Sequence, residues 1–191
     1  NELICVPGNL GAAYCGLRIL ELETRVFAKQ PTVQPKLEGY EFVIGRLLRP
    51  RPRQDAYQQF AAAGIKPSAM MDISDGLSSE LLHICKDSHV GCRIYPGRLP
   101  IDQETYRVAE ELHLDPLFVA MNGGEDYELL FTVPAEYNQK MDDMGVSVIG
   151  YTTAYEQGAV LVTSEGKEYA IDAHGWQAFK EESLPENPKE A

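Results

Sequence analysis

The sequence has 191 residues, of which 44% are hydrophobic and 24% charged, and its formal net charge is -12. This length and apolar content suffice for one substantial core or two small ones, as in a soluble globular protein. The acidic balance argues against a nucleic-acid partner, because binding to a phosphate backbone needs a basic face, and no apolar run reaches the roughly 18 residues of a membrane span.

The first third of the chain predicts one strand and three helices. The strand 3–6 precedes the turn PGNLG and a helix over about 12–27, where apolar residues recur at helical spacing. After a short linker that contains proline, residues 36–48 predict a second helix, which the run RPRPR at 49–53 ends. A third helix continues to Gly64.

The middle of the chain alternates strands and helices. A short apolar strand is expected over 69–73, and apolar residues recur at helical spacing after Gly76, so that DISDG lies on a strand-to-helix turn. The pattern then predicts a strand near 92–95, helices near 102–112 and 116–121, and a strand over 127–133 after a Gly-Gly turn.

The last part predicts a helix near 135–144 and strands near 146–151, 160–163 and 169–171. A short segment with Trp176 follows, and the polar, proline-broken residues 181–191 are expected to form a flexible tail. Mixed elements in this order predict an α+β fold, in which helices pack on a mixed or antiparallel sheet.

The cysteines and histidines carry no recognisable chemistry. The four cysteines form no C-x-x-C pair and the four histidines no metal-spaced cluster, which indicates a reduced, cytoplasmic protein without a zinc site. The opening NELICVPGNLG does not predict a secretory leader, because it lacks a basic region followed by an apolar core. Each cysteine is expected to be a small buried hydrophobic residue and not a nucleophile.

The sequence DISDG at 72–76 is the sharpest chemical signal. A helix amino terminus after Gly76 offers unpaired N–H groups, and Asp72 and Asp75 can hold Mg²⁺ against phosphate oxygens, as an acidic chain that handles phosphates would need. The alternative is that Ser74 or Asp75 simply caps the helix.

The sequence NGGEDYELLFT at 122–132 is the second signal. Gly123 and Gly124 can bring the backbone against a ligand, and Glu125 can accept hydrogen bonds from that ligand. The alternative is a hairpin-like turn with solvated acids.

Taken together, these motifs carry a resemblance to a known family. The residues that carry the resemblance are DISDGLSSEL and GGEDYELLFT, together with V-x-G-x-L-G-x-A-x-x-G-L at 6–17 and R-x-L-R-P-x-P-R at 46–53. The chain resembles thiamine-monophosphate kinases over about 3–176. The wider group includes aminoimidazole ribonucleotide synthetase, selenophosphate synthetase and a hydrogenase-maturation enzyme. DISDGL, in place of a triple-glycine version, argues against the purine enzyme.

The resemblance implies roles for individual residues. It implies that Asp72 and Asp75 bind Mg²⁺ and that no residue acts as a nucleophile. The implied contacts to the two substrates are ATP with Gly11, Ala12, Arg46 and Ser74, and thiamine monophosphate with Glu125 and Trp176.

Three features leave alternatives open. Ala12 stands where the family commonly has a metal-binding aspartate, and a methyl group cannot ligate Mg²⁺, although Asn9 on the same turn could replace it weakly. Arg49, Arg51 and Arg53 are equally expected in a solvated loop. Trp176 could instead pack the carboxy-terminal segment onto the core.

The resemblance implies transfer of the γ-phosphoryl group of ATP to thiamine monophosphate, which gives thiamine diphosphate. It divides the chain into the end of a nucleotide-binding first domain at 1–30, a substrate- and nucleotide-binding domain at 31–180 and the tail. It also implies an intact protein that is a homodimer, of which this chain is an inactive fragment. The alternatives are an inactive ligand-binding module and another ATP-dependent member of the group.

Overall fold

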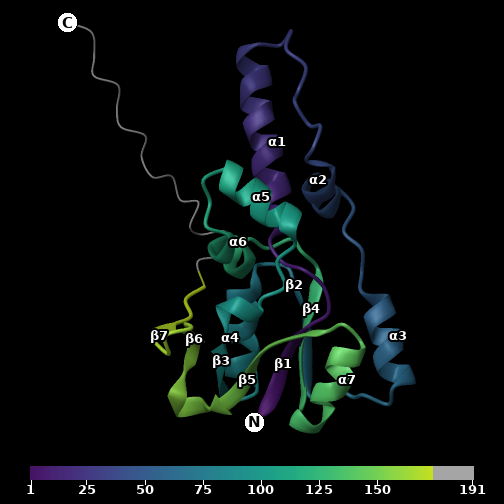
Figure 1. Ribbon diagram of the computed structural model, residues 1–191, viewed down its shortest axis with the longest axis vertical. Coiled ribbons are helices and arrows are strands. Elements are labelled where there is room, and N and C mark those ends of the chain that lie inside the picture. Colours follow the sequence, from purple (N-terminus) through teal and green to yellow (C-terminus); the bar gives the residue numbers. More distant parts are fainter. Residues whose placement is uncertain (174–191) are drawn as a thin grey trace, which may run out of the picture.

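The computed structural model describes residues 1–173, and within them seven strands form one sheet (Figure 1). Their order across the sheet is β2-β4-β1-β5-β3-β6-β7. The strands are β1 (Glu2–Val6), β2 (Ala69–Ile73), β3 (Val90–Ile94), β4 (Glu128–Pro134), β5 (Ser147–Ala154), β6 (Ala159–Val162) and β7 (Glu168–Ala170). Neighbouring strands are antiparallel except β3 and β6, which are parallel. The predicted α+β fold with a mixed sheet is therefore confirmed.

Helices pack on both faces of this sheet. Those of the described chain are α1 (Ala12–Lys29), α2 (Glu41–Leu48), α3 (Gln54–Ala62), α4 (Leu77–Asp87), α5 (Gln103–Glu111), α6 (Pro116–Asn122) and α7 (Asn138–Asp143). One core lies between the sheet and helices α4 and α6, and a second lies between the sheet and helices α3 and α7. The sheet is thus the middle layer.

Alternation along β4 assigns its residues to the two cores. Leu130 belongs to the core under α4, whereas Phe131 and Val133 belong to the core under α3 and α7. The rings of Phe60 and Phe131 pack with their centroids 4.7 Å apart. Because successive side chains of a strand point to opposite faces, this strand, the second from one edge of the sheet, contributes to both cores.

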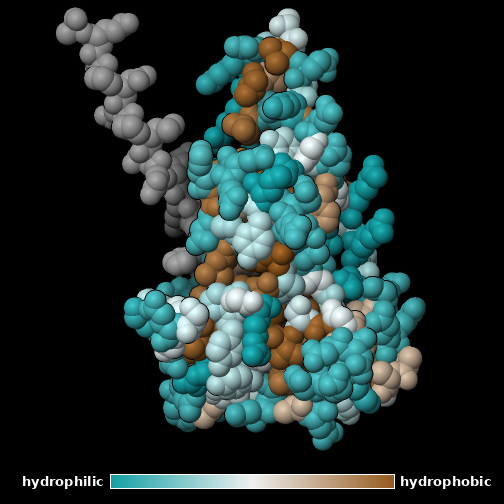
Figure 2. All heavy atoms as spheres, viewed as in Figure 1, coloured by the Kyte–Doolittle hydropathy of each residue, from teal (hydrophilic) through white to brown (hydrophobic). Residues whose placement is uncertain are grey.

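A third apolar cluster lies where α1 meets α2, α5 and α6. It includes Cys15 and Ile19 of α1, Val43 of α2 and Val108 of α5. The outer half of α1 extends beyond the sheet (Figure 1), and apolar spheres gather there in Figure 2. The Phe27 side chain at this outer end is exposed.

Two helix boundaries differ from the sequence-based prediction. The helix expected over 36–48 begins only at Glu41, because Gly39 has φ of 86°, which is incompatible with a right-handed helix. The helix expected over 135–144 starts as a 3₁₀ turn at Ala135–Tyr137 and continues as α7. Both differences lie away from the two motifs.

The cysteines are buried, as expected. Cys5, Cys15, Cys85 and Cys92 are free thiols in the interior. Burial raises the pKa of Cys5 and of Cys15 to about 12, so neither forms a thiolate at neutral pH. In the part of the chain that the structure describes, no helix is long and apolar enough to cross a membrane.

Candidate functional site

The sequence DISDG spans the step from β2 to α4, as predicted: Asp72 and Ile73 end the strand, and residues 74–76 form the turn before the helix. We call residues 72–76 the DISDG turn. Gly76 is the N-cap residue of α4, with φ of 114°, and no side chain donates or accepts a capping hydrogen bond there. The alternative that Ser74 or Asp75 caps this helix is therefore wrong. The side chains of Asp72 and Asp75 are both exposed.

The two motifs lie against each other; we call residues 122–126 the NGGED segment. The Glu125 amide donates a hydrogen bond of 2.7 Å to the Ser74 carbonyl, and the Tyr127 amide donates one of 2.9 Å to Ile73. A Cβ atom on Gly124 would lie 2.6 Å from the Ser74 carbonyl oxygen. Gly124 thus allows close approach to the DISDG turn, whereas the sequence had suggested approach to a ligand.

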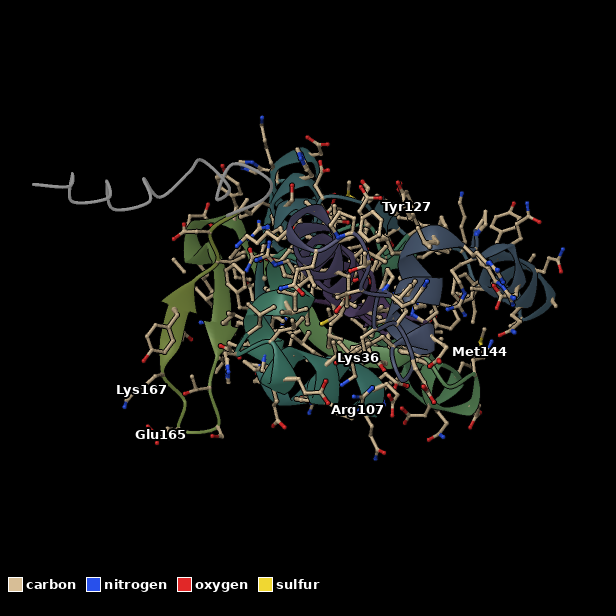
Figure 3. The ribbon with its side chains drawn as sticks, turned by 90° about the horizontal axis from the view of Figure 1, so that it is seen from above. Lys36, Arg107, Tyr127, Met144, Glu165 and Lys167 are labelled. Atoms are coloured by element: carbon tan, nitrogen blue, oxygen red, sulfur yellow. The ribbon has the colours of Figure 1, made fainter. Side chains whose placement is uncertain are left out.

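Three carboxylates lie near the hydroxyl of Tyr127, a residue at the periphery of the molecule (Figure 3). This hydroxyl donates a hydrogen bond of 3.1 Å to Glu125 Oε2. That bond and the charge of Glu125 raise the pKa of Tyr127, and the charges of Asp72 and Asp75 raise it further. The predicted metal ligands Asp72 and Asp75 and the predicted substrate contact Glu125 therefore all lie near Tyr127.

Backbone strain marks the same place. Glu125 and Tyr127 have φ of 60° and 52°, in the left-handed region that residues with a Cβ rarely adopt. Such conformations cluster at binding and catalytic sites, where the surrounding structure enforces them. Here the hydrogen bonds of both residues to the DISDG turn enforce them.

The donor set at this position fits Mg²⁺. Within residues 1–173, no hydrogen bond or ion pair engages the carboxylates of Asp72 and Asp75, and no group of three or more His, Cys, Asp or Glu side chains has metal-binding geometry. Mg²⁺ is commonly held by one or two carboxylates, with phosphate oxygens and water as its other ligands. The two carboxylates of Asp72 and Asp75 therefore match the number of protein ligands that Mg²⁺ commonly has.

Arg46 is held by acidic partners. Its Nη2 donates to Glu128 Oε1 at 2.8 Å and to the Asp126 carbonyl at 3.1 Å, and Glu128 Oε2 accepts from Arg53 Nη1 at 2.7 Å. Glu128 is only 1% exposed. The solvated-loop alternative is therefore wrong for Arg53, whereas Arg49 and Arg51 are exposed as it predicted.

Asp126 is a site residue that the sequence did not single out. It is buried, and its carboxylate accepts hydrogen bonds from the amides of Gly11 at 2.6 Å and Ala13 at 3.3 Å, at the amino terminus of α1. Burial raises the pKa of Asp126 to about 7, although these amides and Arg46 lower it. The alternative of solvated acids in this turn is wrong for Asp126.

Two of the residues that the resemblance assigned to ATP, Gly11 and Arg46, lie near this carboxylate, whereas Ser74 contacts Glu125. The Gly11 amide is already bonded to Asp126, and the Ala12 methyl group is fully buried among apolar residues. A nucleotide contact at Gly11 and Ala12 would have to use other atoms of the turn, and it stays a prediction. The nucleotide contacts of Arg46 and Ser74 also stay predictions. Trp176 lies outside the described residues.

A cavity of about 410 Å³ opens beside the DISDG turn. Asp72 and Tyr127 line it on one side. Its other lining residues are Pro50, Pro52, Arg53 and Leu129. Small-molecule sites commonly have this size and this mixture of apolar walls with a few polar groups.

Comparisons with known proteins agree with this arrangement. Residues 14–163 match the family model "AIR synthase related protein, C-terminal domain". Thiamine-monophosphate kinase of Escherichia coli K12 is 35% identical over 188 residues, which cover 94% of this chain and 53% of that protein. The enzyme of the same name from Buchnera aphidicola (Schizaphis graminum) is 33% identical, with coverages of 87% and 50%.

Solved structures show the same relationship. The structure described as "AaThiL complexed with AMPPCP and TMP" superposes with a TM-score of 0.71 at 30% identity, and the match covers 92% of this chain and 50% of that one. The hydrogenase maturation protein HypE, at 15% identity and a TM-score of 0.61, shares the fold alone. The chain spans about half the length of the curated relatives that it matches. It therefore belongs to the family of AIR synthase related proteins, as their carboxy-terminal domain.

Proposed function

We propose that this chain is the carboxy-terminal part of an enzyme that uses ATP and Mg²⁺ to phosphorylate thiamine monophosphate to thiamine diphosphate. The observation that carries the proposal is the hydrogen-bonded contact between the DISDG turn, which has Asp72 and Asp75, and the NGGED segment, which has Glu125. A relative of the same fold is described as complexed with AMPPCP, an ATP analogue, and with TMP.

Phosphoryl transfer of this kind needs no general base from the protein. A phosphomonoester loses its second proton with a pKa of about 6, so the acceptor oxygen is already anionic at neutral pH. The obstacle is charge repulsion, since unit charges 4 Å apart interact by roughly 4 kcal/mol at an effective dielectric constant near 20. Mg²⁺ bound at Asp72 and Asp75 would offset this repulsion and align the phosphates.

The chain's own residues then have positioning roles. Asp72 ends β2 and Asp75 lies on the turn that the NGGED segment holds, so the backbone of both residues is fixed. Glu125 accepts a hydrogen bond from Tyr127 and keeps further lone pairs that could accept from the amino group of an aminopyrimidine. The cavity beside Asp72 has room for a flat ring.

The division into domains, the homodimer and the cytoplasmic location are further proposals that rest on the resemblance. The same resemblance proposes contacts of Gly11, Ala12, Arg46 and Ser74 with ATP and of Trp176 with thiamine monophosphate. An inactive binding module is the second candidate. Ala12 favours it, because its buried methyl group offers no metal ligand.

One experiment distinguishes the two candidates. The full-length protein that contains this chain is incubated with ATP, Mg²⁺ and thiamine monophosphate, and thiamine diphosphate is measured by chromatography. The kinase reading predicts sustained product formation that requires Mg²⁺. Saturable binding of both compounds without product would identify a binding module, and binding of neither would reject both candidates.

A further inference from the structure

Glu80 is a buried acid that the proposed mechanism does not use. It lies in the first turns of α4 and is 2% exposed. Its Oε1 accepts a hydrogen bond of 3.0 Å from the Asp75 amide, and its Oε2 is buried without a hydrogen-bond partner among the described residues. Removing a carboxyl group from water with only one hydrogen bond costs free energy, so we asked what the bond between Glu80 and the Asp75 amide does.

The surroundings of Glu80 differ from those of the other two buried carboxylates. Glu128 forms ion pairs with two arginines, and Asp126 lies at the amino terminus of a helix and near Arg46. No lysine or arginine of the described chain forms an ion pair with Glu80. Its bond to the Asp75 amide is therefore its main compensation.

This bond lies one residue outside the helix. A capping box would join a first-turn acid to the amide of the N-cap residue, which is Gly76 here. Glu80 instead holds the amide of Asp75, which precedes Gly76. It thus stabilises the DISDG turn more than the helix itself.

The DISDG turn is consequently held from two sides. On one side the Glu125 amide bonds the Ser74 carbonyl, and on the other Glu80 bonds the Asp75 amide. The peptide group between Ser74 and Asp75 is fixed by both contacts, which fixes the backbone from which the Asp75 side chain extends. A ligand to Mg²⁺ must be held in near-ideal geometry, since this ion tolerates little distortion.

We propose that Glu80 is a positioning residue that orients the Asp75 carboxylate for the metal ion. The inference rests on the proposed role of Asp72 and Asp75 as Mg²⁺ ligands. Only one oxygen of Glu80 makes a hydrogen bond, so glutamine can replace it and keep the acceptor. Methionine has a similar length but no oxygen to accept this hydrogen bond. Groups that orient metal ligands are typically worth about 10- to 100-fold in metal affinity.

The test uses Mn²⁺ alone as a paramagnetic probe of the chain labelled with ¹⁵N. Broadening of the amide signals of residues 72–76 gives an apparent Kd for the wild type, Glu80→Gln, Glu80→Met and Ile84→Ala. Ile84 is a residue of α4 that packs into the core, two turns further along the helix than Leu77, so its variant controls for lost helix stability. We expect Glu80→Met to raise the Kd at least about tenfold, and Glu80→Gln and Ile84→Ala to stay within about threefold of the wild type.

Other results of the Mn²⁺ titration would contradict parts of this account. A Kd for Glu80→Met within threefold of the wild type, or an equal rise for Ile84→Ala, would overturn the inference, because Glu80 would then only stabilise the fold. No broadening in the wild type would overturn both the metal site and the inference. Normal broadening in a full-length protein that forms no thiamine diphosphate would reject the kinase proposal and leave the role of Glu80 standing.

Discussion

The backbone amide of Glu125 donates a hydrogen bond of 2.7 Å to the carbonyl of Ser74. This contact joins two segments about fifty residues apart in the sequence and places the proposed substrate contact beside the proposed metal ligands. The same region has two strained residues, Glu125 and Tyr127, which is the usual sign of a site that the rest of the fold holds in place.

The close approach of Gly124 to the DISDG turn predicts that Gly124→Ala destabilises the fold. The new Cβ atom would lie 2.6 Å from the Ser74 carbonyl oxygen, and the φ of 68° disfavours any side chain. We expect a loss of about 1–3 kcal/mol in the free energy of unfolding, measured with urea. Gly145→Ala is the matched control, because Gly145 has φ of 67° and open space around it. Equal losses in both variants would show that the contact contributes nothing.

Arg46 and Arg53 both form ion pairs with Glu128, so the effects of replacing the arginines and Glu128 on the free energy of unfolding should depend strongly on each other. Replacing both arginines by methionine leaves a buried carboxylate without a cation, which should cost about 3–5 kcal/mol. Adding Glu128→Gln should recover a large part of that loss, because the uncompensated charge disappears. Thermal unfolding of the variants measures this coupling, and strictly additive effects would contradict it.

Asp126 predicts a specific dependence of stability on pH. Its pKa is raised to about 7 in the folded chain, against about 3.9 for an unfolded aspartate. The folded state therefore holds this proton more tightly. The resulting stabilisation is fully present below about pH 4 and is lost as the pH rises through 7.

The Gly11 and Ala13 amides donate to different oxygens of Asp126, so Asp126→Asn keeps an acceptor oxygen for only one of them, and it cannot titrate. Unfolding by urea at pH 5 and pH 8 should show that the wild type loses more stability than this variant over that interval. An identical pH dependence in the two proteins would mean that the folded-state pKa of Asp126 is not raised.

The sequence predicts the local parts of this architecture and misses the long-range ones. The DISDG turn follows from an apolar strand, a glycine and helical spacing, all within about fifteen residues. The bond from Gly11 to Asp126 spans 115 positions, and that from Arg46 to Glu128 spans 82, so no local pattern could indicate either. The expected helix over 36–48 failed at Gly39, because helical spacing of apolar residues does not reveal a positive φ.

The most direct test of the central claim compares Asp75→Asn with the wild type in the full-length protein. Asp75 is exposed and its carboxylate makes no hydrogen bond or ion pair with a described residue, so the free energy of unfolding should change by no more than about 0.5 kcal/mol. Formation of thiamine diphosphate, measured over a range of Mg²⁺ concentrations, should fall at least about 100-fold in kcat, because losing a metal ligand removes about 3 kcal/mol of transition-state stabilisation. A variant with normal kcat and normal Mg²⁺ dependence would contradict the assignment of the DISDG turn as the metal site.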